Sequence, residues 1–251
     1  MWDPDKYLTF SDHRSRPFYE LIGRVQAPSP RRVVDLGCGP GTLTSMLAYR
    51  WPSAALEAMD SSPEMVDAAR SRGIDACVGD VADWKPQADT DVIVTNAVLQ
   101  WVPGHDEILR RWVSLLPSGA WIALQVPGNF EAPSHALVRE LVAGSWHSRL
   151  SSVMLREEDA VFTPMGYAAI LDGCQVDAWE TTYIQVLAGD DPVFEWITGT
   201  ALRPIKAELS DEEWDQFRAD LTPMLRAAYP TRTNGETWFP FRRVFVVAQT
   251  P

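Results

Sequence analysis

The sequence predicts an α/β fold in which a mostly parallel sheet carries helices on both faces. One observation is that apolar, strand-like segments alternate with helix-like segments over the first half of the 251-residue chain. Another is the run Val33-Val-Asp-Leu-Gly-Cys-Gly-Pro-Gly41, in which β-branched residues precede three glycines on alternate positions. This run is typical of a buried strand that turns abruptly into a helix, because glycine permits φ > 0 and lets a ligand lie against bare backbone.

The expected elements of the first half follow in chain order. Pro63 suits the first position of a helix, because Ser62 before it can act as the N-cap. The expected helices are 14–25, 63–71 and 105–116, and residues 1–30 are expected to form an N-terminal helical cap. The expected strands are Val33–Leu36, Leu56–Met59, Asp91–Thr95 and Trp121–Val126, with a further strand closing at Val78-Gly-Asp-Val81.

After about Pro127 the pattern changes. Helices are expected over Glu131–Ala143 and Pro164–Asp172, and strands over Val176–Leu187 and Trp238–Ala248. The segment between these strands is helical in pattern, with a capping box at Ser210-Asp-Glu-Glu213. An apolar stripe follows at Trp214, Phe217, Leu221 and Leu225. We expect one domain over 1–251, with a helical insertion at 188–233 that covers the substrate pocket.

Composition excludes several function classes. The formal net charge is −12 with acidic and basic residues mixed, which disfavours a nucleic-acid partner. Three unclustered cysteines favour reduced thiols, and four histidines without ligand spacing give no reason to expect a metal. No apolar run could span a bilayer and no signal-peptide pattern is present, so we expect a cytoplasmic protein without a membrane partner. We also expect a monomer.

Three acids follow three successive strands, at the edge where α/β sheets bind ligands. The Gly-x-Gly-x-Gly pattern resembles the cofactor loop of S-adenosylmethionine (SAM) dependent methyltransferases. A dinucleotide fingerprint would instead place its third glycine at position 42, which is Thr42. In a SAM site, Asp35 could meet the ammonium group, Asp60 the ribose hydroxyls and Asp80 the adenine N6. The remaining cofactor candidates are Gly37, Cys38, Gly39, Ser61, Val81, Asn96 and Trp101.

Trp101 has two interpretations that the sequence leaves open. Its ring could favour the sulfonium cation of SAM by up to ~2 kcal/mol if the contact is desolvated. Equally, the ring could pack against the following helix.

The whole chain resembles the trans-aconitate 2-methyltransferase family of class I SAM-dependent methyltransferases. The motifs that carry the resemblance, besides the glycine loop, are Tyr7-Leu-x-Phe10, Arg14-Ser-Arg-Pro17, Asp60-Ser-Ser-Pro63, Leu99-Gln-Trp101, Trp179-x-Thr-Thr-Tyr183, Trp196-Ile-Thr198, Leu202-Arg-Pro204 and Arg243-x-Phe-x-Val-Ala248. The resemblance implies a Rossmann-like sheet with its last strand antiparallel, SAM as cofactor, S-adenosylhomocysteine as product, and the monomethyl ester of the tricarboxylate trans-aconitate. Gln185 replaces an expected histidine and Arg242 an expected proline, which bears on preference among related carboxylates.

A carboxylate is already ionised at neutral pH, so this chemistry needs positioning and no catalytic base. Arginine binds carboxylates with a planar fork, which makes the arginines in the family-like motifs substrate candidates. The candidates are Arg14, Arg16, Arg203 and Arg243, with Tyr183 as a hydrogen-bond donor. Surface pairing is the ordinary alternative for an arginine, and an N-terminal arginine could instead hold the SAM carboxylate.

Three other functions stay open at the level of sequence. The chain could methylate another small carboxylic acid, or a hydroxylated metabolite, for which His13 or His105 would have to act as base. A nicotinamide-dependent oxidoreductase is disfavoured by Thr42. A non-catalytic SAM-binding regulator is the third.

Overall fold

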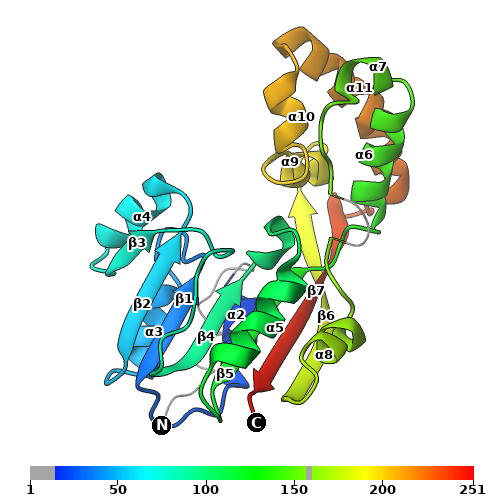
Figure 1. The fold of residues 1–251 in the computed structure, drawn as a ribbon. Helices are drawn as coiled ribbons and strands as arrows, with labels where there is room; N and C mark the ends of the chain where they lie inside the picture. The colour runs from blue at the N-terminus through cyan, green and yellow to red at the C-terminus, as the bar shows by residue number, and fades with distance from the viewer. Residues whose placement is uncertain (1–14, 157–159) are drawn as a thin grey trace. The chain divides into compact units, whose positions relative to one another are not determined.

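A seven-stranded sheet in the order β3-β2-β1-β4-β5-β7-β6 organises the fold, seen in a computed structural model that describes residues 15–156 and 160–251 (Figure 1). Its strands are β1 (Arg32–Leu36), β2 (Ala55–Asp60), β3 (Ala76–Val78), β4 (Thr90–Asn96), β5 (Trp121–Pro127), β6 (Gln175–Ala188) and β7 (Glu236–Gln249). Strands β1 to β5 pair in parallel, and β7 pairs antiparallel with β5. The predicted fold class, including the antiparallel last strand, is confirmed.

The helices lie in the predicted helical segments, to within a few residues, apart from the one at 147–150, where no helix is predicted. They are α2 (Arg16–Gly23), α3 (Thr44–Arg50), α4 (Pro63–Arg70), α5 (His105–Leu115), α6 (Pro133–Ala143), α7 (His147–Leu150), α8 (Pro164–Ile170), α9 (Pro192–Thr198), α10 (Arg203–Glu208) and α11 (Asp211–Ala228), with a 3-10 turn η1 (Leu99–Trp101). Both predicted caps are confirmed: the Ser62 hydroxyl accepts from the Met65 N–H, and Ser210 and Glu213 form a capping box.

The chain divides into two compact units. Unit 1 consists of the described residues up to Pro127, Val161–Thr181 and Arg243–Pro251, whereas unit 2 consists of Gly128–Ala160 and Thr182–Arg242, apart from residues 157–159. In the described parts of the chain, no helix has both the length and the apolar character that crossing a membrane requires.

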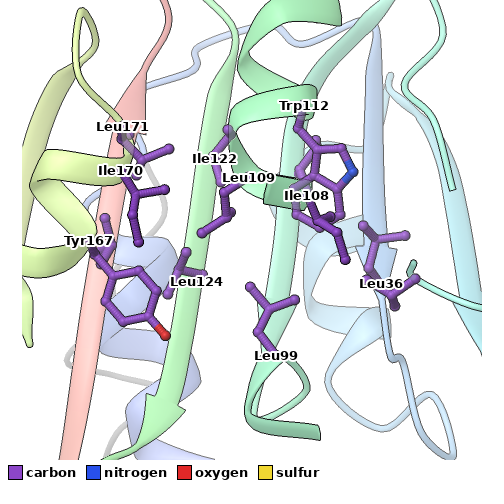
Figure 2. Close-up of a cluster of buried hydrophobic side chains, with 14 of the residues drawn as sticks. Leu36, Leu99, Ile108, Leu109, Trp112, Ile122, Leu124, Tyr167, Ile170 and Leu171 are labelled. Carbon is purple, nitrogen blue, oxygen red and sulfur yellow. The ribbon is translucent and has the colours of Figure 1, made fainter. Parts of the chain in front are cut away.

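The core of unit 1 lies between the sheet and helices α5 and α8 (Figure 2). Alternate residues of the strands, such as Leu36 and Leu124, point into this core and meet Trp112 of α5 and Tyr167 of α8. Side chains alternate along a strand, so Asp35 of β1 lies on the opposite face, as do Asn96 and Gln125 at the ends of β4 and β5. Helices α2 and α3 contact the sheet at β5 and β2.

Unit 2 has its own apolar core, built from α6, α7, α9, α10, α11 and part of β7. The predicted stripe supplies its centre, because Phe217, Leu221 and Leu225 are buried there and Trp214 packs against them. Val138 of α6 belongs to the same cluster. The helices expected in the insertion thus share a core with a helix from an earlier part of the chain.

Candidate functional site

The glycine loop after β1, residues 37–41, is the first part of the candidate site in unit 1. Gly37, Gly39 and Gly41 have φ values of +81°, +53° and +75°. A Cβ on Gly37 would lie 2.1 Å from Val98 Cγ2, so packing alone requires glycine there. A Cβ on Gly39 would meet no heavy atom within 4 Å. The backbone at Gly39 is therefore open to a ligand, as the sequence predicts for a cofactor loop.

The end of β2 is bonded directly to this loop. The Gly39 N–H donates to Asp60 Oδ2 at 2.8 Å, and the Ser62 N–H donates to Asp60 Oδ1 at 3.0 Å. The Met59 carbonyl accepts from the N–H groups of Gly37 and Cys38. The Asp60 carboxylate thus lies beside the open backbone of Gly39, with Ser61 next to it in the chain.

Asp35 is almost fully buried behind the loop. Its Oδ2 accepts a hydrogen bond of 2.6 Å from the Thr44 hydroxyl of α3. Burial raises the pKa of the Asp35 carboxyl to about 6; the Thr44 hydrogen bond opposes this shift, and the Asp60 charge adds to it. A cation placed beside Asp35 would therefore be stabilised by this carboxylate and would lower its pKa again.

Cys38 shows no sign of a nucleophilic role. Burial, with the charges of Asp35 and Asp60, raises the pKa of its thiol to about 12. The thiol is therefore protonated at neutral pH, and a protonated thiol is a poor nucleophile. The backbone N–H of Cys38 is bonded to the end of β2.

Asp80 follows β3 and lies next to a segment that is bonded to Asp60. The Gly79 N–H donates to the Asp60 carbonyl at 3.0 Å, and a Cβ on Gly79 would lie 2.4 Å from Met59 Sδ. The exposed Asp80 carboxylate accepts from the Ala82 N–H at 2.8 Å. Val81 is 6% exposed and belongs to the core of unit 1.

The end of β4 supplies the next part of the site. Asn96 has a buried Oδ1 with no hydrogen-bond partner among the described residues. Ala97 has φ +60°, a left-handed conformation that is strained for a residue with a side chain. Its N–H donates to the Gln125 carbonyl at 2.8 Å, and its carbonyl accepts from Gln100 Nε2 at 2.7 Å. The Trp101 ring that follows is 56% exposed.

His105 lies close by in the chain, but both ring nitrogens are engaged. Nδ1 lies 3.1 Å from the Val102 carbonyl, which can only accept, so Nδ1 carries the proton and Nε2 accepts from the Tyr167 hydroxyl at 3.0 Å. Burial lowers the pKa of this histidine. His105 therefore stabilises the fold and is not placed as a base, while His13 lies outside the described residues.

The candidate substrate residues are divided between the two units, and Arg14 lies outside the described residues. In unit 1, Arg16 pairs with Glu20 at 2.7 Å, and Arg243 Nη1 donates to Gln125 Oε1 at 2.8 Å. In unit 2, Tyr183 is buried and Arg203 is exposed at the start of α10. Gln185 and Arg242 also belong to unit 2, where Gln185 is buried and Arg242 Nε donates to the Gly128 carbonyl at 2.7 Å.

The structure therefore brings together the cofactor candidates at the ends of β1, β2 and β4. Two further residues were not found from the sequence. Ala97 was missed because only its backbone angle marks it, and Gln125 because it is a single polar residue inside an apolar strand. Gln125 could have been found from the sequence, because a polar residue in the middle of an apolar strand segment is unusual.

Known proteins resemble this chain in sequence and in fold. Residues 10–159 match the family model described as a methyltransferase domain. The chain is 65% identical over 252 residues, covering 99% of both chains, to a trans-aconitate 2-methyltransferase from Rhodococcus jostii (strain RHA1). It is 59% identical, over 100% of both chains, to a protein of the same name from Mycobacterium sp. (strain KMS).

Solved structures share the fold at low sequence identity. The YcgJ protein from Bacillus subtilis aligns with a TM-score of 0.57 at 18% identity, covering 92% of this chain and 96% of that one. A Haemonchus contortus phosphoethanolamine N-methyltransferase 2, in complex with S-adenosyl-L-methionine, aligns with a TM-score of 0.53 at 14% identity over 92% of this chain and 51% of that one. On the strength of the family model and the full-length relatives, the chain belongs to the methyltransferases, within the trans-aconitate 2-methyltransferase family.

Proposed function

We propose that the protein transfers a methyl group from SAM to one carboxylate of trans-aconitate, giving the monomethyl ester and S-adenosylhomocysteine. The observation that carries the proposal is the open backbone at Gly39 with the Asp60 carboxylate bonded to it. The names of full-length relatives at 58–65% identity support the choice of substrate.

The residues of unit 1 fit this cofactor. Asp60 is a carboxylate beside an open glycine, which suits a ribose diol, because a carboxylate accepts from two hydroxyls. Asp35 suits an ammonium group, which only donates, and so does Asn96, whose Oδ1 has no hydrogen-bond partner among the described residues. We propose that the Asp80 carboxylate accepts a hydrogen bond from the adenine N6 and that the exposed ring of Trp101 contacts the sulfonium cation. When bound, SAM supplies an electrophilic methyl group.

The chain's own contribution to the reaction is positioning. A carboxylate of trans-aconitate is ionised at neutral pH, so no residue has to remove a proton before it attacks. This agrees with the engagement of both His105 nitrogens inside the core. Aligning two bound reactants can contribute several kcal/mol to such a step. The substrate roles of Arg14, Arg16, Tyr183, Arg203 and Arg243 remain proposals, as do the influence of Gln185 and Arg242 on substrate preference.

The test is transfer of tritium from methyl-labelled SAM to trans-aconitate, cis-aconitate, isocitrate and citrate in parallel. We expect the largest kcat/KM for trans-aconitate. Methylation of none of the four, with SAM still bound, would contradict the proposal and favour a SAM-binding regulator. Preference for another acid of the panel would keep the reaction and change the substrate.

A pair of variants tests the cofactor site. Asp60→Ala is expected to raise the KM for SAM at least tenfold and to leave the KM for trans-aconitate within a factor of two. Asp67→Ala removes the same charge from an exposed position of α4 and should change neither constant. Equal effects of Asp60→Ala on both substrates would refute its ribose role.

A further inference from the structure

We propose that Gln125 is a positioning and specificity-determining residue for a carboxylate of the substrate: its amide oxygen holds the Arg243 guanidinium, and its amide nitrogen donates to the same carboxylate. This proposal rests on the proposed function and deepens it.

Gln125 lies on β5, next to strand β7, which carries Arg243. Strands β5 and β7 pair so that Gln125 lies opposite Phe245, and Pro127 opposite Arg243. The Gln125 side chain is 1% exposed and lies on the face of the sheet opposite Leu124. Its Oε1 accepts from Arg243 Nη1 at 2.8 Å. A guanidinium can only donate, so this contact fixes which end of the amide faces the arginine.

Gln125 Nε2 is buried and has no hydrogen-bond partner among the described residues. Asn96 is in register with Gln125 and shares its face, yet its Oδ1 is also without a partner in the described chain. Buried amide groups are rarely left without partners, so a donor in this state indicates an acceptor supplied by a ligand.

Nε2 of Gln125 is a donor that lies next to the cationic group held by the same side chain. A carboxylate matches this pair, because it carries a negative charge and accepts at two oxygens. An ester or an amide would lack the charge that Arg243 favours. The arrangement therefore selects an ionised carboxylate.

The position in the sheet assigns the carboxylate to the methyl acceptor. At ~4.8 Å per strand, β5 lies ~10 Å from β1 and its glycine loop, and ~14 Å from β2 and Asp60. Arg243 on β7 is one strand farther. The proposed cofactor residues Asp35 and Asp60 thus lie on one side of Asn96, and Gln125 and Arg243 lie on the other.

The experiment measures binding and turnover of Gln125→Glu, which keeps an acceptor for Arg243 but replaces the donor by a carboxylate that repels the substrate. Gln125→Leu, which removes both groups, is the second variant. Gln249→Glu makes the same chemical change elsewhere in unit 1, at a glutamine that bonds the Gly119 carbonyl. Calorimetry gives the Kd for trans-aconitate and for SAM, steady-state rates give KM and kcat, and thermal unfolding reports folding.

Three dicarboxylates, each lacking a different carboxylate of trans-aconitate, then locate the contact. Glutaconate, itaconate and mesaconate serve as inhibitors whose Ki is measured with wild-type enzyme and with each variant. We expect Gln125→Glu to raise the Kd for trans-aconitate at least tenfold and to leave the Kd for SAM within twofold. For one of the three dicarboxylates, the one that lacks the contacted carboxylate, the Ki should be the same in the variant as in the wild-type enzyme. Gln249→Glu should change none of these constants.

Other results would contradict either the role of Gln125 or the proposed function. An equal penalty for all three dicarboxylates, or unchanged binding in folded Gln125 variants, contradicts the inference, and a loss confined to SAM assigns the amide to the cofactor. If the wild-type protein binds trans-aconitate without methylating it, the proposed function fails and the variants still decide the role of Gln125. If it neither binds nor methylates trans-aconitate, both proposals fail.

Discussion

Replacing Gly39 by alanine separates the cofactor role of the glycine loop from its role in folding. Because a Cβ there would meet no heavy atom within 4 Å, the methyl group adds only the strain of a non-glycine residue at φ +53°, about 1 kcal/mol. A loss of that size lowers the unfolding midpoint by about 2–4 °C in a protein of this length. At Gly37, by contrast, the same change adds overpacking against Val98 that costs about 1–3 kcal/mol more.

The methyl group at position 39 would occupy space that the account gives to SAM. Calorimetric titration is therefore expected to show a Kd for SAM raised at least tenfold, or about 1.4 kcal/mol. Gly119→Ala is the matched control, because Gly119 has φ +78° and lies before the start of β5, and an added Cβ would lie 3.8 Å from Gln249 Nε2. This control should lower the unfolding midpoint equally and leave SAM binding unchanged. If Gly39→Ala also binds SAM like the wild-type protein, the reasoning about the open backbone is wrong.

Further predictions concern pH, strain and one buried hydrogen bond. Because the Asp35 pKa is about 6, this carboxyl is protonated below pH 6 and must release its proton to pair with the ammonium group of SAM. The Kd for SAM should therefore rise up to tenfold per pH unit below pH 6 and stay constant above it. Asp35→Asn should remove this dependence, and a flat wild-type Kd from pH 5 to 7.5 would refute it. Burial lowers the pKa of His135 to about 4, so the unfolded chain binds a proton at a higher pH than the folded chain does. Because of this histidine, the free energy of unfolding measured by denaturant titration should be about 2 kcal/mol lower at pH 5 than at pH 7. His135→Gln should reduce that difference, and no reduction would contradict the assignment. Ala97→Gly relieves left-handed strain and should raise the free energy of unfolding by about 0.5–1 kcal/mol; a decrease would show that the strain is not real. Tyr167→Phe leaves Nε2 of His105 without its donor and should cost about 1–3 kcal/mol by the same titrations, whereas a cost near zero would argue against the buried pair.

Features set by local sequence could be predicted. The strand before the glycine loop, the Ser62 cap and the Ser210–Glu213 box follow from neighbouring residues, so the sequence alone specifies them. Asp60 lies beside the glycine loop because it ends the strand next to β1, and the carboxyl ends of parallel strands share one edge, which a pattern of successive strands already predicts.

Features that depend on residues far apart in the sequence could not be predicted from the sequence. Gln125 obtains its partner Arg243 from 118 positions away, and His105 obtains Tyr167 from 62 positions away. Nothing in the local sequence distinguishes these polar residues from ordinary strand and helix positions. The shared core of α6 and α11 has the same origin, because Val138 and Leu221 meet only when the chain is folded. Sequence indicated where the cofactor candidates lie, but not which polar groups would remain without partners.

The central claim is that a carboxylate oxygen receives the methyl group. Its most direct test is to incubate the enzyme with methyl-labelled SAM and trans-aconitate, isolate the labelled organic acid, and treat it with mild alkali. A methyl ester releases its label as methanol, so we expect all of the label to appear in methanol, with one methanol for each S-adenosylhomocysteine formed. Label that stays on the acid after alkali would show transfer to a carbon atom and would contradict methylation of a carboxylate.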